Sequence, residues 1–517
     1  MLIAICDHFG HLIEQRSYDS LGRLSGHTRL NTAISFYSSA CREGTTTSYS
    51  YDHRGRLRDS WVNHHNDFLF TYNYFIDILN AAGDSKVRTG IGENCCPYYF
   101  TFETFDRYGR RTSAGVEGGD VAHFTHDLRG RVINERSAFV NNTYTHDIFG
   151  NVLTITNIEG NTSRFTYDNL GRLIAATDFK GNTSHSYYDA AGRLIKTRTP
   201  FERVNGQMQY SITKFFYDQN SNVIRTAVSS GTPGGPEQWR ETTAVFDIMN
   251  RVTSTTTDNI TAHYTYDAAG NVLTMTVGGT GPSGGSTTTY VYDILGRLIS
   301  VTDALGQTET YAYDIRGRLI SKTDRNGTVF TYQYDGFDRL IRETASDGSG
   351  RLFVYRYDGQ LSAETNGTIT VIYHYDNLRR LIRQEETGGI VKTYEYNIAG
   401  MRTRYTLSIN GVRQINTTYV YDSAGRLARV YENGALKAAY TYDVNGNRNS
   451  LTYGNGNVTI YTYNYANLIT SVTNRQTNGG AVLSSYAYTY FLDGNQRTRT
   501  TTQAVSPPSF TTPQAVS

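Results

Sequence analysis

The sequence predicts an all-β protein, a repeat array of antiparallel β-hairpins coiled into a spiral β-shell. A 21-residue pattern that begins Tyr-x-Tyr-Asp-x-x-Gly-Arg-Leu recurs along most of the 517 residues. Where the repeat is clearest its aspartates fall 10 or 11 residues apart, at Asp293, Asp303, Asp314, Asp324 and Asp335. The runs between them are rich in Tyr, Thr and Val, which strands favour. Each half-unit therefore predicts one short strand and one tight turn.

The turns have their own chemistry. In Asp-x-x-Gly, as at Asp168 to Gly171, the carboxylate can accept a backbone N–H two residues on, and the fourth position tolerates a positive φ when it is glycine. Arg172 directly follows the turn and lies within reach of Asp168. An exposed ion pair of this kind is worth roughly 0 to 1 kcal/mol. We therefore interpret these arginines as markers of the repeat register.

The residues predicted to have this structural role belong to six copies of the motif. They are Tyr167, Asp168, Gly171, Arg172, Tyr188, Asp189, Gly192, Arg193, Tyr292, Asp293, Gly296, Arg297, Tyr313, Asp314, Gly317, Arg318, Tyr334, Asp335, Tyr421, Asp422, Gly425 and Arg426.

Alternation along a strand assigns the faces of the sheet. Tyr311 and Tyr313 should point to one side of the sheet and Ala312 to the other. Phe165 and Tyr167 should likewise share one side. A lone hairpin is marginal in water, so the repeats must stack. Full burial of one aromatic ring stabilises the folded state by at most about 4 to 6 kcal/mol, because it removes apolar surface from water. The 42 tyrosines are thus expected to form ladders between strands.

The regularity of the repeat spacing divides the chain into three parts. Residues 1–105 carry irregular repeats with inserts, the largest at Trp61–Phe100. Residues 106–497 form the regular shell, and the polar residues 498–517 predict a disordered tail.

Longer gaps interrupt the regular part of the chain. Those at Pro200–Tyr210, Gly231–Trp239 and Gly278–Gly285 are rich in Gly, Pro or polar residues and predict surface loops. A further copy of the motif is expected at Tyr357-Asp358.

Charge and hydropathy exclude several classes of function. The 49 Lys and Arg against 47 Asp and Glu leave a net charge of +2, which disfavours nucleic acid and anionic lipid as partners. No apolar run approaches the roughly 18 residues of a membrane span. Met1–Cys6 is too short for a signal peptide, and the chain is expected to begin inside an array.

No motif for a metal or a cofactor stands out. The four cysteines, Cys6, Cys41, Cys95 and Cys96, lack a zinc-site spacing or a disulfide framework. His64 to Asp67 predicts a polar loop tip, because further ligands at a recognisable spacing are missing. Gly279–Gly284 matches G-x-G-x-x-G, but a strand follows it where a dinucleotide site needs a helix. We expect neither metal, cofactor nor catalytic residues.

The number of strands bears on the architecture. Two strands for each of some twenty units give about forty strands, whereas open sheets rarely exceed about ten without curling. A coiled ribbon would also hide most of its edges and create an inside and an outside.

The copies at 167–173, 188–194, 313–319 and 421–427 resemble the YD repeat of the Rhs and teneurin families, over roughly residues 6 to 497. The resemblance implies a β-shell. In Rhs toxins and the C component of insecticidal toxin complexes it encloses a C-terminal toxin, and in teneurins it serves adhesion. A secreted or cell-surface location is implied as well. The sequence up to Arg497 lacks the self-cleaving block of Rhs shells, and residues 498–517 are not expected to form a toxin domain.

Three functions follow. The leading hypothesis is a non-catalytic shell segment that scaffolds or encapsulates a toxin or effector polypeptide, as part of a larger Rhs protein. The alternative is an extracellular adhesion module that binds glycans or a receptor through exposed aromatic residues and loops. An enzyme is disfavoured, since aspartates that recur in every repeat do not form one unique constellation.

Overall fold

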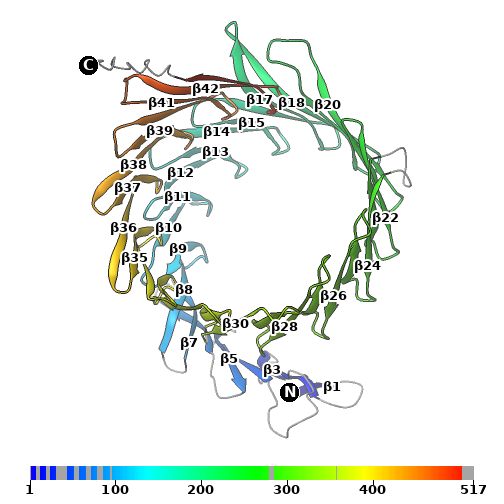
Figure 1. The fold of residues 1–517 in the computed structure, drawn as a ribbon, viewed down its shortest axis with the longest axis vertical. Helices are drawn as coiled ribbons and strands as arrows, with labels where there is room; N and C mark the ends of the chain where they lie inside the picture. Colours follow the sequence, from blue (N-terminus) through cyan, green and yellow to red (C-terminus); the bar gives the residue numbers. More distant parts are fainter. Residues whose placement is uncertain are drawn as a thin grey trace, which may run out of the picture. The chain divides into compact units, whose positions relative to one another are not determined.

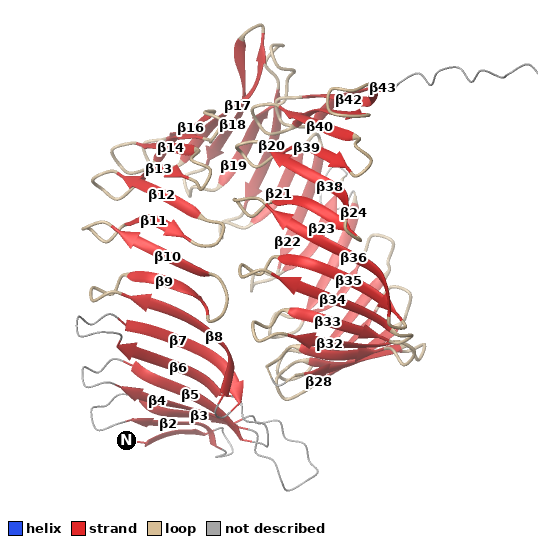
Figure 2. Cartoon of the chain, turned by 90° about the vertical axis from the view of Figure 1, so that its left-hand side faces the viewer, coloured by secondary structure: helices blue, strands red, loops and turns tan. Residues whose placement is uncertain are grey.

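A computed structural model describes residues 2–6, 12–18, 24–30, 44–51, 57–65, 71–78, 85–93, 96–278, 285–356 and 358–503. Every regular element in these ranges is a β-strand, and the turns lie at the strand ends (Figure 2). The chain divides into two compact units. Unit 1 comprises Met1–Tyr144 and Thr308–Thr418, and unit 2 comprises Thr145–Gln307 and Tyr419–Ser517.

Unit 1 holds two runs of strands, labelled in Figure 1. The first run is β1 (Leu2–Cys6), β2 (Leu12–Tyr18), β3 (Leu24–Leu30), β4 (Gly44–Tyr51), β5 (Leu57–His65), β6 (Thr71–Ile78), β7 (Ser85–Glu93), β8 (Cys96–Phe105), β9 (Arg111–Val116), β10 (Val121–His126), β11 (Val132–Arg136) and β12 (Asn141–His146), which contains the unit boundary. The second run is β26 (Thr308–Tyr313), β27 (Leu319–Thr323), β28 (Val329–Tyr334), β29 (Leu340–Ala345), β30 (Gly350–Tyr355), β31 (Leu361–Thr365), β32 (Thr370–Tyr375), β33 (Leu381–Glu386), β34 (Ile390–Tyr396), β35 (Arg402–Ile409) and β36 (Val412–Tyr421), which also crosses a boundary.

Unit 2 likewise holds two runs. The first is β13 (Val152–Thr156), β14 (Thr162–Tyr167), β15 (Leu173–Thr177), β16 (Thr183–Tyr188), β17 (Leu194–Val204), β18 (Gln207–Tyr217), β19 (Val223–Ser229), β20 (Trp239–Phe246), β21 (Val252–Thr257), β22 (Ile260–Tyr266), β23 (Val272–Val277), β24 (Ser286–Tyr292) and β25 (Leu298–Thr302). The second is β37 (Leu427–Glu432), β38 (Ala435–Tyr442), β39 (Arg448–Tyr453), β40 (Val458–Tyr463), β41 (Ile469–Arg475), β42 (Val482–Tyr490) and β43 (Gln496–Gln503).

Within each run, strands consecutive in the sequence pair antiparallel, as β26 with β27 and β27 with β28. The register shifts at the residue before the motif aspartate, which is a tyrosine in most copies, for example between Ala312 and Tyr313. Such a bulge adds a residue to one strand and increases the local twist. The predicted all-β array of antiparallel hairpins is therefore confirmed.

The two faces of the sheet differ in chemistry. On β26, Tyr311 and Tyr313 lie half-buried on one side, here called the aromatic face, while Thr310 and Ala312 are exposed on the other, the threonine face. Cross-strand hydroxyl contacts such as Thr177 to Thr183, 2.8 Å, join neighbouring strands. Few large side chains are fully buried among the described residues, Phe201 being one. The sheet therefore depends on lateral contacts more than on a packed core.

The tyrosine ladders differ from the expectation. Ring-to-ring contact occurs at Tyr394 and Tyr405, whose centroids are 5.6 Å apart. At many other rings an arginine or lysine covers the face, as Arg380 does at Tyr396, 4.9 Å. The rings stay half-buried, because a one-layer sheet offers them no second layer to pack against.

Two local predictions were wrong. Pro200–Tyr210, expected to be a loop, lies mostly in the long hairpin of β17 and β18, which turns at Asn205 and Gly206 with φ of 51° and 80°. Asn-Gly is the preferred pair for such a two-residue turn. The motif expected at Tyr357-Asp358 starts two residues earlier: Gly359 N–H donates to the Arg356 carbonyl at 3.0 Å, so Arg356 takes the aspartate position and preserves the 21-residue spacing from Asp335.

The structure describes only some of the other segments for which the sequence makes a prediction. Trp61–Phe100, expected to hold an insert, carries β5 to β8, and β43 extends six residues into the expected tail. The loop Gly231–Trp239 joins β19 and β20. Gly279–Gly284, Asn66, Asp67, Cys41 and Cys95 lie outside the described residues, as do the side chains of His64, His65, Cys6 and Cys96.

Within the described ranges there is no helix that could cross a membrane. In the same ranges no three His, Cys, Asp or Glu side chains converge in a way that could hold a metal ion.

Candidate functional site

The motif turn after each tyrosine is closed by a repeated set of hydrogen bonds. At Asp168, one carboxylate oxygen accepts the backbone N–H groups of Leu170, 2.9 Å, and Arg172, 3.0 Å. The other oxygen accepts Arg172 Nε–H at 2.7 Å. Gly171 has a φ of 75°, the left-handed conformation that its missing Cβ permits. Local sequence therefore builds each turn without help from distant residues.

These hydrogen bonds hold the carboxylates ionised. The backbone N–H and side chain of Arg172 lower the pKa of Asp168 below its usual 3.8. At Asp127 the side-chain hydrogen bond from Arg131 and its backbone N–H lower the pKa to about 2. In several turns an asparagine replaces the arginine, as Asn271 does at Asp267, 2.8 Å. Anions held in this way are poor proton donors at neutral pH.

The arginine also reaches the next repeat, which an isolated ion pair would not do. The Arg172 guanidinium lies 4.7 Å from the Tyr188 ring centroid, and its Nη1 lies 3.4 Å from the Asp189 carbonyl oxygen. Side chains at this position are partly buried, with 27% of Arg172 exposed. Interpreting these arginines as markers of register alone was incomplete, since Arg172, Arg193 and Arg318 each bridge two repeats.

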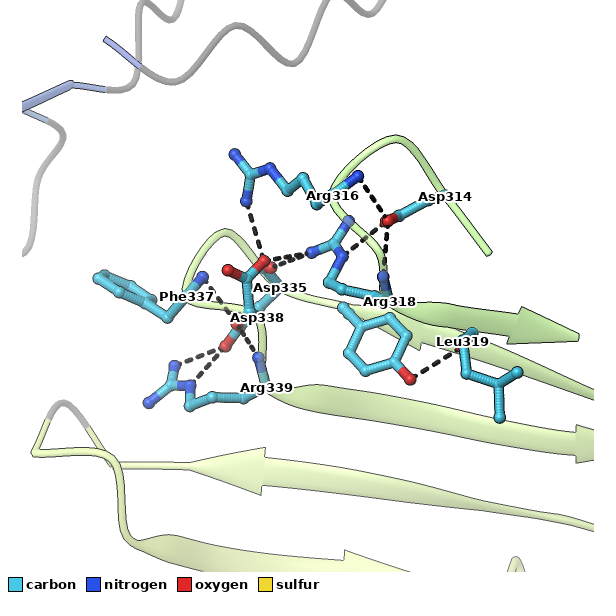
Figure 3. A network of polar contacts seen from close by, with 9 residues as sticks. Asp314, Arg316, Arg318, Leu319, Asp335, Phe337, Asp338 and Arg339 are labelled. Carbon is cyan, nitrogen blue, oxygen red and sulfur yellow. Dashed lines mark hydrogen bonds and ion pairs between the residues drawn. The ribbon is translucent and has the colours of Figure 1, made fainter. Parts of the chain in front are cut away.

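Figure 3 shows this bridge in unit 1. Arg318 donates to Asp314 at 2.6 Å and to the Asp335 carbonyl at 3.3 Å. Asp338, which replaces the turn glycine and has a φ of 64°, pairs with Arg318 at 2.8 Å and Arg316 at 2.9 Å. Two successive turns are thus joined by a network of charge-assisted hydrogen bonds.

The motif tyrosine bonds to the preceding repeat, whereas the motif arginine contacts the following one. The Tyr334 hydroxyl donates to the Leu319 carbonyl at 2.8 Å, and the Tyr188 hydroxyl to the Leu173 carbonyl at 3.0 Å. The accepting residue is the leucine of the preceding Gly-Arg-Leu. Sequence reasoning missed this role because a backbone acceptor leaves no side-chain signature.

The structure brings some of the predicted residues together. The copies at 167–172 and 188–193 are adjacent, as are 313–318 and 334–335, and each pair is bridged by an arginine. In the third copy Arg297 pairs with Asp293, 2.6 Å, and in the last Arg426 pairs with Asp422, 2.8 Å. The predicted set therefore forms a distributed lattice and not one pocket.

In unit 2 a second kind of site joins segments far apart in the sequence. Arg426 pairs with Glu159, 267 residues away. Lys180 pairs with Asp443 at 2.6 Å, and Asn445 donates to Asp178 at 2.8 Å. The later residues belong to motif turns, and the earlier ones to the turns at the other end of the strands. We call this set of contacts the return contact.

The return contact continues along the same edge. Tyr465 N–H donates to the Phe201 carbonyl and Leu492 N–H to the Gly231 carbonyl, both at 3.0 Å. Each step of one repeat in the later segment is matched by one step in the earlier segment, so that successive motif turns of the later segment contact successive repeats of the earlier one. No local pattern in the sequence marks these partners, because separations of about 260 residues follow from the winding and not from one repeat.

Comparison with protein families decides the relationship. The teneurin YD-shell model matches residues 280–410, and the RHS repeat model matches residues 146–183 and 421–458. These residues of the chain therefore match YD-shell and RHS repeats. Comparison with curated protein sequences gives no match.

Solved structures share the fold of this chain. The crystal structure of TcdB2-TccC3-Cdc42 matches with a TM-score of 0.59 and 14% identity, over 95% of this chain and 30% of that one. TcdB2-TccC3 without the hypervariable C-terminal region gives 0.56 and 14%, over 97% and 31%. The Photorhabdus luminescens Tc holotoxin pore with a mutated TccC3 gives 0.53 and 14%, over 94% and 32%. The chain thus spans about a third of the length of these proteins.

Proposed function

We propose that this chain forms part of the wall of a shell that encloses a toxin or effector polypeptide, and that it does so without catalysis. The return contact carries this proposal. A sheet one layer thick, whose later strands lie in step against earlier ones through Lys180 with Asp443 and Tyr465 with Phe201, is built as a wall with two open faces. Motif side chains engaged with one another have little capacity left for chemistry.

Fold similarity supports the same proposal. One of the matched structures is a holotoxin pore by its title, and its fold is similar to that of this chain. From this similarity we extend to the chain a secreted location and a place within a larger assembly. Both remain part of the proposal.

Protease protection of a co-expressed effector polypeptide tests the enclosure. The full protein should shield that polypeptide, and reversing the charges of the return contact with Glu159→Lys and Lys180→Glu should expose it. Glu241→Lys with Lys437→Glu is the matched control, since both residues form exposed ion pairs between neighbouring strands. Equal digestion of the effector polypeptide with and without the full protein would overturn the proposal.

Two exposed aromatic turn residues favour a second candidate, the binding of glycans or a receptor. Tyr108 and Phe149 are 67% and 81% exposed at motif turns. Arg107 and Arg110 lie over the Tyr108 ring, so stacking on a sugar is expected chiefly at Phe149. Glycan-array binding that is lost on Tyr108→Ser with Phe149→Ser would support this function. An array without any bound glycan would remove it.

A further inference from the structure

Strands β16 to β20 carry a cluster of cations on the threonine face. Lys196 lies directly opposite Tyr187 on one side and Lys214 on the other, and Arg198 lies two residues along the same strand. On the next strand pair Arg225 lies opposite Phe216, two residues beyond Lys214. Directly opposed and alternate residues share a face. We call Lys196, Arg198, Lys214 and Arg225 the basic patch.

Each cation of the basic patch lies over an aromatic ring. Lys196 is 3.9 Å from the Tyr187 centroid and Arg198 is 3.5 Å from that of Tyr210. Lys214 is 3.8 Å from Trp239, and Arg225 is 3.8 Å from Phe216. The rings hold the long side chains along the sheet surface, which reduces the entropy lost when they bind a partner.

The charge of the basic patch is poorly balanced. Glu241 pairs with Arg225 at 3.1 Å, but among the described residues no carboxylate lies within ion-pair distance of Lys196, Arg198 or Lys214. Lys196 and Lys214 are moreover directly opposite, an arrangement that destabilises a sheet. Elsewhere in the protein lysines on the sheet have acidic partners, as Lys322 has Glu309 and Lys392 has Glu386.

A hollow of about 550 Å³ adjoins the patch. Its lining includes Ile195, Phe216, Ile224, Arg225 and Thr243. Asp189 and Arg193 also line it, and they are paired with each other at 2.7 Å. The hollow therefore combines aliphatic and aromatic walls with the Arg225 guanidinium, so it suits an apolar side chain next to a carboxylate.

We propose that the basic patch and this hollow bind an acidic polypeptide segment in extended conformation. Alternate residues on a strand are about 7 Å apart, so carboxylates at every second residue of an extended peptide match cations spaced like Lys196 and Arg198. Nucleic acid fits less well, because single strands bind by stacking bases on aromatic faces, and here the cations cover those faces. This inference does not depend on what the shell encloses.

Fluorescence anisotropy of the full chain at low salt tests the proposal, with a short labelled peptide of alternating glutamate and leucine as the probe. The double variant Lys196→Gln with Lys214→Gln should bind this peptide about tenfold or more weakly, since two of four charges are lost. Its melting temperature should change little, because relief of the repulsion between the opposed lysines offsets the loss of their contacts with Tyr187 and Trp239. Loss of binding therefore cannot be attributed to unfolding.

Lys322→Gln with Lys392→Gln is the matched control and should leave the affinity for the peptide unchanged. A peptide with lysine in place of glutamate should not bind. Equal binding of the acidic peptide by the Lys196 and Lys214 variant, or by both double variants alike, would overturn the proposal. The proposal would also be overturned if a single-stranded DNA of equal charge bound more tightly than the acidic peptide and lost this binding in the Lys196 and Lys214 variant. The occupant would then be nucleic acid.

Discussion

Motif turns in the two segments of unit 2 share their internal bonds but differ in their surroundings. At Asp247, Arg251 donates from Nε at 2.8 Å, and at Asp422, Arg426 does the same at 2.8 Å. The middle residues of the earlier turn, Ile248 and Met249, are exposed, whereas the later turns take part in the return contact. We call the first kind free turns and the second kind docked turns.

The difference shows that docking is added to a turn that is already complete. Arg426 keeps its bond to Asp422 and its stacking on Tyr442 while it also pairs with Glu159. Asp443 likewise closes its own turn through Asn447 and accepts Lys180. The repeat therefore specifies the ribbon, and a few residues outside the motif, such as Glu159 and Lys180, specify how the ribbon returns.

The largest difference between docked and free regions is expected at Phe201. Its ring is 1% exposed, at the bulge between Pro200 and Glu202, and its carbonyl accepts Tyr465 N–H. Phe201→Ala should lower the free energy of unfolding by about 3 to 5 kcal/mol. Ile294→Ala in a free turn, where the side chain is 102% exposed, should change it by less than about 0.5 kcal/mol. Chemical denaturation measures both, and equal effects would contradict the distinction.

A smaller difference is expected between Arg426→Ala and Arg251→Ala. Both substitutions remove a turn ion pair and a stacked tyrosine. Arg426 also pairs with Glu159, whereas Arg251 donates to the neutral Asp267 carbonyl at 3.0 Å, a weaker kind of hydrogen bond than one to a carboxylate. The docked variant should therefore lose about 1 to 2 kcal/mol more, as for a charge-assisted hydrogen bond that is partly buried. In a double-mutant cycle, Glu159→Gln should have little further effect in the Arg426→Ala background. Full additivity of the two substitutions would show that the pair does not stabilise the return contact.

Acid should loosen the return contact. Desolvation alone would raise the pKa of Asp443, but hydrogen bonds from Lys180 and Asn447 outweigh it and lower the pKa below 3.8. A lowered carboxyl pKa contributes stability that is present above pH 3.8 and is lost as the pH falls through the folded-state value. Amide exchange of Tyr465, which donates to Phe201, should therefore accelerate as the pH falls below 3.8. Asp443→Asn should remove most of the pH dependence at Tyr465.

The sequence could predict the structure of a single repeat but not the contacts between repeats or the return contact. The turn of Asp168, the positive φ of Gly171 and the facing of Tyr311 follow from local chemistry and periodicity, and the structure contains all three. The bridge from Arg172 to Tyr188 and the hydrogen bond to the Leu173 carbonyl depend on the register between strands, which a single repeat does not reveal. The return contact depends on a separation of about 260 residues, which is a property of many strand twists added together.

The smallest difference in stability between docked and free repeats is expected for substitutions of the motif tyrosines. These substitutions test the contacts within one run of strands separately from the return contact. Tyr442 in a docked repeat donates to the Leu427 carbonyl at 2.8 Å, and Tyr266 in a free repeat donates to the Val252 carbonyl at 2.6 Å. Because both bonds lie between strands of one run, Tyr442→Phe and Tyr266→Phe should each cost about 1 kcal/mol, with no difference between them. Native-state hydrogen exchange of the flanking strands measures both. A larger loss at Tyr442 would mean that the return contact tightens the ribbon beneath it, so that repeat and winding would be coupled and not simply added.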